Sequence, residues 1–574
     1  MNRKKFVELV TGCTGAIVAT PFIEFSENLL IVKKRSVSTS SESGLSADVV
    51  ICGGGLGGCA AALSALRNNL SVILTEETDW IGGQLSQQGV PPDEHQWIET
   101  HGCTKLYRDF RTLVRQYYKR NYPLTEHASQ NQYLNPGDGS VSRLCHEPRV
   151  AVAVLRDLLA PYISSNNLKL LTEYKISAAD VEGDHVRSVN AVSRISGNSI
   201  ILSAPYFIDA TELGDLLPLT KTEFITGSES RMDTGELHAP DKADPEDNQS
   251  FTMCFAMDYI PGENHTIARP VSYDFWKNYI PDLTPPWSGK LLSLSYSNPS
   301  TLVPKELGFH PEGLDTSPLL NLWNYRRIIN RKNFKPGTFQ SDITLVNWPQ
   351  NDYMLGNLIG ASEQDFKKHV EGAKQLSLSL LYWLQTEAPR PGNGYGWSGL
   401  RLRNDIMGTE DGLAKYPYIR ESRRIKAMFT VKEEHVGKEN RSLLSDKSKE
   451  IVAADFFDSV GIGYYHIDLH PSNKGNNYID FPSLPFQIPL GSLIPIRVKN
   501  LIAANKNIGT THITNGCYRL HPVEWSIGEA AGLLAAFSLS KKKHPGVVRQ
   551  RASLLKEFQS LVRSNGIETH WPKL

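Results

Sequence analysis

The sequence predicts an α/β fold organised around a parallel sheet, and three stretches of the chain carry this prediction. The first is VVICGGGLGGCAA at 49–61, where a β-branched run leads into closely spaced glycines. The second is SVILTEE at 71–77, a short apolar strand that follows an alanine-rich helix. The third comes far along the chain, where VKNLIAANKNIG at 498–509 and a helix of small residues repeat the pattern. Strands that alternate with helices are typical of a parallel sheet.

The chain from Asp48 onward begins with a βαβ unit. Within about thirty residues it has a strand, a glycine turn, a helix and a second strand. Gly53, Gly55 and Gly58 have the spacing G-x-G-x-x-G, which lets a backbone approach a pyrophosphate and then start a helix. Glu76 ends the second strand, where a carboxylate accepts hydrogen bonds from the ribose hydroxyls of an adenosine. A carboxylate there disfavours a 2′-phosphate, so a phosphorylated nicotinamide cofactor is a poor candidate.

The elements that follow can be placed in order. In LCHEPR, Pro148 is expected to start the helix VAVAVLRDLLAPY. Residues 168–203 alternate β-rich runs with the turn signals EGD and SGN, which predicts a meander of strands. The meander leads into the apolar strand YFIDAT, which is expected to end near Asp209.

A second glycine pair, Gly82 and Gly83 in TDWIGGQ, suits a domain that holds an extended FAD and is not needed in a nicotinamide-only domain. Further segments of the same kind are LCHEPRVA, YFIDATELGDLLPL, PYIRESRRI, YYHIDLHPS and NLIAANKNIGTTHITNGCYRLHPVEWSIGEAAGLLAA, which extend to about residue 540. Together these stretches resemble the FAD-dependent oxidoreductases of the glutathione-reductase-like superfamily. More narrowly, they resemble the FAD-dependent oxidoreductase family that includes the flavin portion of heterodisulfide reductase.

The resemblance implies a fold and a cofactor. The fold is an FAD-binding Rossmann-like domain of the glutathione-reductase type with an inserted α+β substrate or cap domain. The cofactor is FAD, bound non-covalently, because no motif singles out a histidine for covalent attachment. The implied cofactor-binding residues are Gly53, Gly55, Gly58, Glu76, Gly83, Gln84, Gly528 and Ala530.

The last two of these residues lie in WSIGEAAGLLAAFSL. In the resembling flavoproteins this late helix points its N-terminus at the flavin pyrimidine. A helix N-terminus carries about half a positive charge, which stabilises the anionic N1–C2=O end of reduced flavin. The sequence departs from the superfamily at Glu212, which replaces the usual glycine after Ala-Thr.

The stretch RLHPVEW at 519–525 holds the densest set of candidate catalytic groups, Arg519, His521 and Glu524, just before the late helix. His521 would take a proton from an alcohol as hydride leaves, because its pKa lies near working pH. Arg519 would anchor a carboxylate or an oxygen-rich substrate. The alternative is structural, with Glu524 paired to Arg519 and His521 capping the helix beside Pro522.

Two further motifs contain candidate polar residues. His466 and His470 in YYHIDLHPS have an i, i+4 spacing, but Pro471 and the β-rich run favour a strand or loop. No metal site is therefore predicted, and substrate contact or an ordinary surface position remain for these histidines. The arginines of PYIRESRRI either bind an anionic substrate or form a carboxylate network that holds the inserted domain.

Two functions agree with these observations. The first is an FAD-dependent oxidoreductase that transfers hydride between flavin N5 and a small polar organic substrate. The second is a flavin-binding electron-transfer subunit that works with an iron–sulfur partner, since this chain has no C-x-x-C pair for a cluster of its own. An electron acceptor protein or a quinone is a further candidate partner. A third possibility is an NAD-dependent dehydrogenase without flavin. It fits least well, because it does not explain why the dinucleotide-binding domain is completed only far along the chain.

Composition and the N-terminus bound the remaining possibilities. Lys plus Arg total 61 and Asp plus Glu total 61, so no net field attracts nucleic acid, and none is expected as a partner. After the first residues no segment offers the roughly 18 uncharged apolar residues of a membrane span. MNRKKFVELV places cations before an apolar run, and Arg-Lys-x-Phe is a degraded twin-arginine signature. This predicts export to the periplasm or outside the cell; an N-terminal arm of a cytoplasmic protein is the alternative.

The expected organisation is an export signal at 1–26, a Ser-rich linker at 27–46, the first part of the FAD-binding domain at 47–220, the inserted domain at 221–455, the second part of the FAD-binding domain at 456–540 and a helical tail at 541–574.

Overall fold

A computed structural model describes residues 38–40, 44–314, 316–444 and 450–572. The export signal expected at 1–26 lies outside these residues, as does most of the expected linker. The described end of the expected linker instead forms two strands, β1 (Ser38–Ser40) and β2 (Gly44–Ser46). Strand β2 pairs in parallel with β8, Ser199–Ser203.

The predicted parallel sheet is present and joins the two ends of the chain. Its strands are β3 (Val49–Cys52), β4 (Val72–Glu76), β5 (Leu168–Thr172), β9 (Tyr206–Asp209) and β26 (Leu501–Ala503), in the order β26-β9-β3-β4-β5. All four pairings are parallel. The central strands β3 and β9 are buried along their whole length, as expected of a sheet covered on both faces. The carboxyl ends of β3 and β9 therefore lie side by side.

The predicted meander is also present. Strands β6 (Tyr174–Glu182), β7 (His185–Ser193) and β8 pair antiparallel in sequence order. The turn glycines Gly183 and Gly197 have positive φ angles and open space around them, which fits the turn signals EGD and SGN.

Two helices cross at the sheet with almost no side chain between them. Helix α2 spans Leu56–Arg67 and helix α15 spans His521–Lys541. A Cβ atom added to Gly528 would lie 2.1 Å from the carbonyl oxygen of Gly57, and one added to Gly532 would lie 2.3 Å from that of Ala61. Glycine is thus required for this close packing.

Helix α15 begins earlier than the sequence suggested. It starts at His521, with Leu520 as the N-cap and Pro522 in the first turn, so His521 and Glu524 lie within the helix and not before it. Gly528 and Ala530 consequently lie in its interior. Their expected contacts with the cofactor stay a prediction, whereas Gly528 has a packing role against α2.

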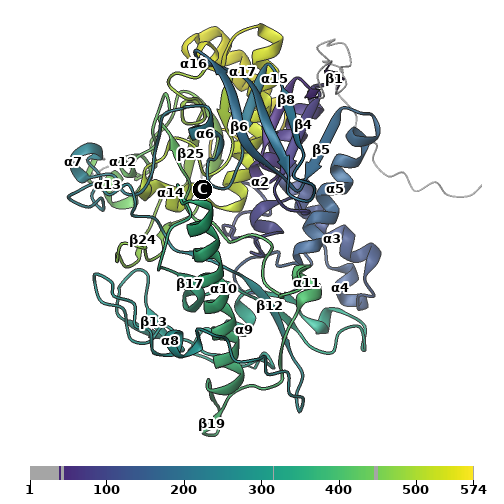
Figure 1. The fold of residues 1–574 in the computed structure, drawn as a ribbon, viewed down its shortest axis with the longest axis vertical. Coiled ribbons are helices and arrows are strands. Elements are labelled where there is room, and N and C mark those ends of the chain that lie inside the picture. Colours follow the sequence, from purple (N-terminus) through teal and green to yellow (C-terminus); the bar gives the residue numbers. More distant parts are fainter. Residues whose placement is uncertain (1–37, 41–43, 315, 445–449, 573–574) are drawn as a thin grey trace, which may run out of the picture. The chain divides into compact units, whose positions relative to one another are not determined.

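A second sheet lies in the chain between β9 and β26. Strands β12 (Phe255–Tyr259), β15 (Arg327–Ile329), β16 (Ile343–Val346) and β20 (Leu400–Leu402) pair antiparallel in the order β15-β16-β12-β20. Helix α10 (Glu363–Thr386) runs beside β17 (Asp352–Tyr353), as Figure 1 shows. The Ser377 hydroxyl on α10 donates to the Met253 carbonyl at 2.6 Å. This α+β part fits an inserted domain, although its limits at 221 and 455 stay a proposal.

The remaining helices and strands complete the described chain. The other helices are α3 (Lys105–Asn121), α4 (Glu126–Gln130), α5 (Pro148–Ser164), α6 (Leu216–Leu219), α7 (Arg231–Thr234), α8 (Tyr273–Asn278), α9 (Leu322–Tyr325), α11 (Asn404–Met407), α12 (Glu433–Val436), α13 (Lys438–Leu444), α14 (His512–Tyr518), α16 (Pro545–Gln550) and α17 (Ala552–Ser564). The other strands are β10 (Phe224–Ile225), β11 (Phe251–Thr252), β13 (Ser295–Ser297), β14 (Pro304–Glu306), β18 (Pro389–Arg390), β19 (Gly394–Tyr395), β21 (Arg424–Ile425), β22 (Ser459–Gly463), β23 (Ile467–Leu469), β24 (Ile479–Phe481) and β25 (Phe486–Pro489). No helix in the described part of the chain has the length and apolar character to cross a bilayer.

The crossing of α2 and α15 gives a first prediction. Gly528→Ala would push a methyl group into the Gly57 carbonyl, and we expect it to lower the free energy of unfolding by about 1–3 kcal/mol, the usual cost of overpacking. Chemical denaturation followed by circular dichroism measures this loss. Gly546→Ala on α16 is the matched control, because its nearest neighbour would lie at an ordinary 3.4 Å. Equal stability of the two variants would show that the helices do not depend on this contact.

Candidate active site

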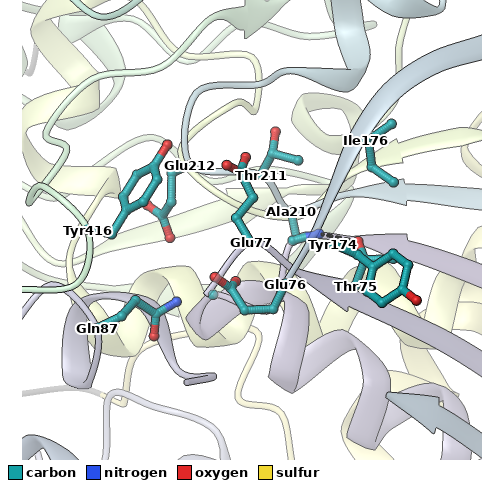
Figure 2. Close-up of a pocket in the computed structure, with 12 residues that line it drawn as sticks. Thr75, Glu76, Glu77, Gln87, Tyr174, Ile176, Ala210, Thr211, Glu212 and Tyr416 are labelled. Carbon is teal, nitrogen blue, oxygen red and sulfur yellow. Dashed lines mark hydrogen bonds between the residues drawn. The ribbon is translucent and has the colours of Figure 1, made fainter. Parts of the chain in front are cut away.

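One cavity opens at the glycine turn, where β3, β4 and β9 end. Figure 2 shows Glu76 and Glu77 between Tyr416 and Gln87 on one side and Tyr174 on the other. The full wall consists of Gly53, Gly55, Thr75, Glu76, Glu77, Gln87, Tyr174, Ile176, Ala210, Thr211, Glu212 and Tyr416. The sequence therefore placed three of its expected cofactor residues, Gly53, Gly55 and Glu76, on one cavity. We call it the nucleotide cavity.

Glu76 lies where a ribose-binding carboxylate was expected. One of its oxygens accepts a hydrogen bond from the Gly54 amide at 3.1 Å, and the other accepts one from the Thr78 amide at 2.9 Å. Burial raises the pKa of Glu76 to about 8, against the lowering effect of the hydrogen bonds from Thr78. The carboxyl group is thus held rigidly at the end of β4, beside the glycine turn.

The three motif glycines have different roles. Gly53 has φ +100°, and a Cβ atom there would lie 2.2 Å from the Ala210 carbonyl oxygen on the neighbouring strand. A Cβ atom at Gly58 would lie 1.9 Å from the Gly53 carbonyl oxygen. At Gly55, in contrast, the nearest atom is a side-chain oxygen of Glu212 at 2.6 Å. Gly53 and Gly58 therefore hold the turn together by backbone packing, whereas Gly55 keeps the cavity wall bare.

Gly83 completes this cradle from the other side. It has φ +58°, and a Cβ atom there would lie 2.9 Å from the Leu56 amide and 3.0 Å from Gly55 Cα. Its own amide donates to the side chain of Gln87 at 2.9 Å. The second glycine pair thus lies directly against the first turn. This is the arrangement expected of a domain that holds an extended FAD.

A buried cation, Lys506, lies beside the turn, and no motif in the sequence indicated it. Its ammonium group contacts Glu212 at 2.5 Å and Glu524 at 3.5 Å, and its side chain is fully buried. Burial acts to lower the pKa of Lys506, but the two carboxylates outweigh it and the net shift is upward. Only its position, directly after β26 in LIAANKN, marks this lysine in the sequence.

The residues around this lysine fit FAD. The bare backbone at Gly55 leaves room for a pyrophosphate, while the charge of Lys506 is already matched by Glu212 and Glu524. Glu212, at the position where the sequence departs from the superfamily, has a buried oxygen, Oε1, without a hydrogen-bond partner. A buried acceptor without a donor is costly, so this oxygen is suited to a group that the protein alone does not supply.

Glu524 ties the start of α15 to the turn. One oxygen accepts from the Gly57 amide at 3.1 Å, and the other accepts from the Gln84 side chain at 2.5 Å. The same Gln84 amide group donates to the Arg519 carbonyl oxygen at 2.9 Å. The suggested pairing of Glu524 with Arg519 is therefore wrong, because Glu524 is already engaged with Gly57, Gln84 and Lys506.

His521 is fully buried in the first turn of α15. It lines neither the nucleotide cavity nor the cavity beside Arg519. Its Nδ1 accepts a hydrogen bond from the Asp93 amide at 3.0 Å. Burial lowers the pKa of His521 to about 4, so the ring is neutral at pH 7. His521 thus supports the chain at Asp93.

A second cavity, with a volume of about 170 Å³, adjoins the start of α15. Its polar and aromatic wall residues are Asp93, Tyr296, Tyr325, Arg326, Asn347, Trp348, Tyr418, Arg420, Tyr465, His466, Asp468, His470, Tyr478, Asp480 and Arg519. We call it the substrate cavity. Of the three expected catalytic residues, only Arg519 lines it.

Arg519 is fixed from two sides. It donates to the Tyr418 hydroxyl at 2.8 Å and to the Asp468 carboxylate at 2.9 Å. Asp468 belongs to β23, a strand flanked by His466 and His470 as the sequence predicted. The arginine is held at the boundary between this strand and the N-terminus of α15.

The arginines of the motif PYIRESRRI pair with carboxylates, and one of them also lines the substrate cavity. Arg420 lines the substrate cavity and donates to Asp352 at 2.9 Å. Arg424 instead forms a buried network with Glu421 at 2.5 Å and Glu229 at 3.0 Å. Arg423 pairs with Asp215 at 3.0 Å, so of the three arginines in the motif only Arg420 lines the substrate cavity.

One segment separates the two cavities. Tyr416 lines the nucleotide cavity, while Tyr418 and Arg420 line the substrate cavity. The segment is anchored to the stretch after the second glycine pair, because the Tyr416 amide donates to the Gln87 carbonyl oxygen at 3.1 Å. Both cavities therefore share walls built from the same two pieces of chain.

Comparisons with known proteins agree with this geometry. The family model described as "FAD dependent oxidoreductase" matches residues 48–561. No curated protein sequence matches the chain. Among solved structures, similarity is found to the L-proline dehydrogenase of P. horikoshii, with 18% identity over 32% of this chain and 24% of that one, and a TM-score of 0.17.

Two further solved structures are similar. The glycerol-3-phosphate dehydrogenase of Bacillus halodurans complexed with FAD has 14% identity over 38% of this chain and 41% of that one, with a TM-score of 0.23. The quinol fumarate reductase FrdA of E. coli has 11% identity over 90% of this chain and 74% of that one, with a TM-score of 0.30. The match thus spans less than half of each of the two dehydrogenases. Because the family model covers residues 48–561 of the 574, the chain belongs to the FAD dependent oxidoreductase family, and FAD is its cofactor.

Proposed function

We propose that this FAD-dependent oxidoreductase transfers hydride between flavin N5 and a small polar organic substrate bound in the substrate cavity. The observation that carries the proposal is the position of Arg519. It lines the substrate cavity, and the helix that starts two residues later contacts the glycine turn through Glu524. A polar pocket and a dinucleotide cradle thus meet at one helix N-terminus, where clefts of this fold bind their ligands.

The nucleotide cavity would hold the dinucleotide part of FAD. Gly55, with Gly83 packed against it, would leave space for the pyrophosphate, and Glu76 would accept hydrogen bonds from the ribose hydroxyls. Gln84 lines neither cavity, but its bonds to Glu524 and to the Arg519 carbonyl connect the residues behind both. When bound, FAD supplies the redox chemistry, and the protein positions the substrate and moves the proton.

Arg519 would anchor an oxygen atom of the substrate. Its bonds to Tyr418 and Asp468 fix the guanidinium plane, so little side-chain entropy is lost when a ligand binds. Glu524 and His521 are proposed as positioning residues. Glu524 links α15 to Gly57, and His521 holds the backbone at Asp93, whose carboxylate faces Arg326 at 3.3 Å in the cavity wall.

The alternative is a flavin-binding electron-transfer subunit with an iron–sulfur partner. It would use the same nucleotide cavity but would need no built substrate site. The substrate cavity, with its many polar side chains, supports the first function. Reduction of the bound flavin by a purified iron–sulfur protein and by no small molecule would favour the second.

The first experiment is an absorption spectrum of the purified protein before and after denaturation. We expect two flavin bands that move to the supernatant when the denatured protein is removed, because no covalent link is predicted. Colour that stays with the pellet would reveal covalent FAD. Protein without flavin bands, even after incubation with FAD, would contradict the proposed function.

Gly55→Ala should weaken FAD binding at least tenfold while the protein stays folded. The added methyl group projects toward the cavity and the carboxylate of Glu212, and not into backbone. Fluorescence titration of the apoprotein with FAD measures the affinity, and circular dichroism checks the fold. Gly394→Ala is the control, because its nearest neighbour would lie at 3.6 Å. Unchanged FAD affinity in Gly55→Ala would remove this glycine from the cofactor site.

The buried state of His521 predicts a pH dependence of stability. Its pKa is about 4 in the folded protein and about 6.5 when unfolded, so the unfolded state binds the extra proton. The stability contributed by the neutral ring is complete above pH 6.5 and is lost as the pH falls toward 4, by roughly 3 kcal/mol.

The variant His521→Asn keeps an acceptor for the Asp93 amide but has no proton to gain. We therefore expect a flatter stability curve between pH 6.5 and 4, measured by denaturation at each pH, with the exposed His127→Asn as control. A curve as steep as that of the unmodified protein would mean that His521 is protonated in the folded state, as a proton-transfer role would allow.

A further inference from the structure

The charges on the wall of the substrate cavity are already paired with one another. Arg519 contacts Asp468 at 2.9 Å, and Arg420 contacts Asp352 at 2.9 Å. Arg326 contacts Asp93 at 3.3 Å. A charged ligand would therefore meet no uncompensated partner and would have to break one of these pairs.

His466 continues the same pattern at the mouth of the cavity. Its Nδ1 lies 3.0 Å from Asp480, and its side chain is 43% exposed. Three arginines and three aspartates line the cavity, and Asp352, which pairs with Arg420, is a fourth carboxylate. The fourth cationic partner is His466, because burial acts to lower its pKa but Asp480 and Asp468 outweigh burial and raise it. With His466 charged, the wall has many hydrogen-bond donors and acceptors but no excess of either charge.

Aromatic side chains form the remaining surface. Trp348 and five tyrosines line the cavity, namely Tyr296, Tyr325, Tyr418, Tyr465 and Tyr478. Such side chains present an apolar face together with a polar tip. Flat apolar faces combined with paired charges suit a molecule that has C–H faces and a ring of hydroxyl groups.

One histidine on this wall, His470, is held in position by a buried carboxylate. Nδ1 of His470 lies 2.6 Å from a carboxylate oxygen of Asp352. The Asp352 side chain is fully buried, and its other oxygen accepts hydrogen bonds from Thr252 at 2.7 Å and Arg420 at 2.9 Å. Such a carboxylate fixes the tautomer and orientation of the ring.

Nε2 of His470 is the atom left for a ligand. The nearest carboxylate oxygen, on Asp468, is 3.6 Å away, which is too long for a hydrogen bond. Burial would raise the pKa of Asp352, but Arg420 and His470 outweigh it and lower that pKa below its usual value. Asp352 is therefore ionised and accepts from Nδ1–H, which leaves Nε2 for a ligand; in the neutral ring this nitrogen carries the lone pair.

We propose that the substrate cavity binds a neutral polyhydroxylated molecule, a sugar or polyol, and that Nε2 of His470 accepts the proton of the hydroxyl group that is oxidised. This inference rests on the proposed function. His470 is the catalytic residue, and Asp352 is its positioning residue.

In this step the O–H bond of the substrate breaks, its proton passes to Nε2, and the ring becomes an imidazolium. The electron pair of that bond forms the C=O bond, and the hydrogen of the adjacent C–H bond leaves with its electron pair to the FAD of the proposed function. The substrate is oxidised to a ketone or aldehyde, and FAD is reduced by two electrons.

Sugars that share one skeleton and differ in charge test the substrate class. FAD-loaded protein is titrated by calorimetry with the neutral D-glucose, D-galactose, D-xylose and myo-inositol, the anionic D-gluconate and D-galacturonate, and the cationic D-glucosamine. Each mixture is also followed without oxygen for bleaching of the flavin band. We expect at least one neutral member to bind and bleach, and the charged members to bind at least tenfold more weakly.

Tighter binding of an acid or of the amine would overturn the inference, and so would failure of all four neutral members to bind. Reduction by dithionite and reoxidation in air are measured on the same sample. Protein that holds no FAD contradicts the proposed function itself. Protein that holds reducible FAD but prefers charged ligands contradicts only the substrate class.

Variants at His470 test the proton acceptor. In His470→Gln we expect the rate of flavin reduction by the bound sugar to fall by about 10²–10⁴, the usual contribution of a general base. The calorimetric affinity for that sugar should change by less than threefold. His470→Ala should recover part of the rate when imidazole is added to the buffer, which a merely structural histidine would not do. His127→Gln on α4 is the control, and a His470→Gln rate within threefold of it would overturn the assignment.

Discussion

The contact between the backbones of α2 and α15 is the constraint on which the rest of the site depends. Gly57 and Gly528 meet without side chains between them, which brings the first turn of α15 to the glycine turn. From there Glu524 reaches the Gly57 amide, and Arg519 enters the wall of the substrate cavity. Larger side chains at this crossing would move the two cavities farther apart.

Buried charge is the second organising feature. Lys506, Arg420 and Arg519 all have fully or almost fully buried side chains, and each is matched by carboxylates. Isolated charges in such places cost several kcal/mol, whereas paired ones are tolerated and hold their neighbours in fixed positions. The pairs around the substrate cavity thus act as a rigid, nearly neutral frame, and those around Lys506 leave one oxygen of Glu212 unsatisfied.

The two cavities differ in how they are built. The nucleotide cavity is formed mainly by the ends of regular strands and a bare backbone, so its shape follows from the sheet. The substrate cavity is formed by side chains from β23, α9 and loops of the long stretch between β9 and β26, together with Asp93 and Arg519 from outside that stretch. In the proposed function the cofactor would bind in the first cavity and specificity would depend on the second, as is common when one fold serves many reactions.

The sequence by itself determined the parallel sheet, the meander and the glycine cradle with Glu76, because these depend on local patterns such as β-branched runs, turn glycines and a terminal carboxylate. It also placed Arg519 near the site. It did not reveal Lys506, and it predicted His521 as the base while leaving His470 with a lesser role.

Only the tertiary structure decided those points. Helix α15 starts at His521 and not at Trp525. The side chain of His521 therefore points into the core, where burial keeps it neutral. The role proposed for His470 depends on its contact with Asp352, which lies 118 residues earlier in the chain. Burial and pairing between distant segments set the chemistry of a side chain, and no local pattern in the sequence encodes them.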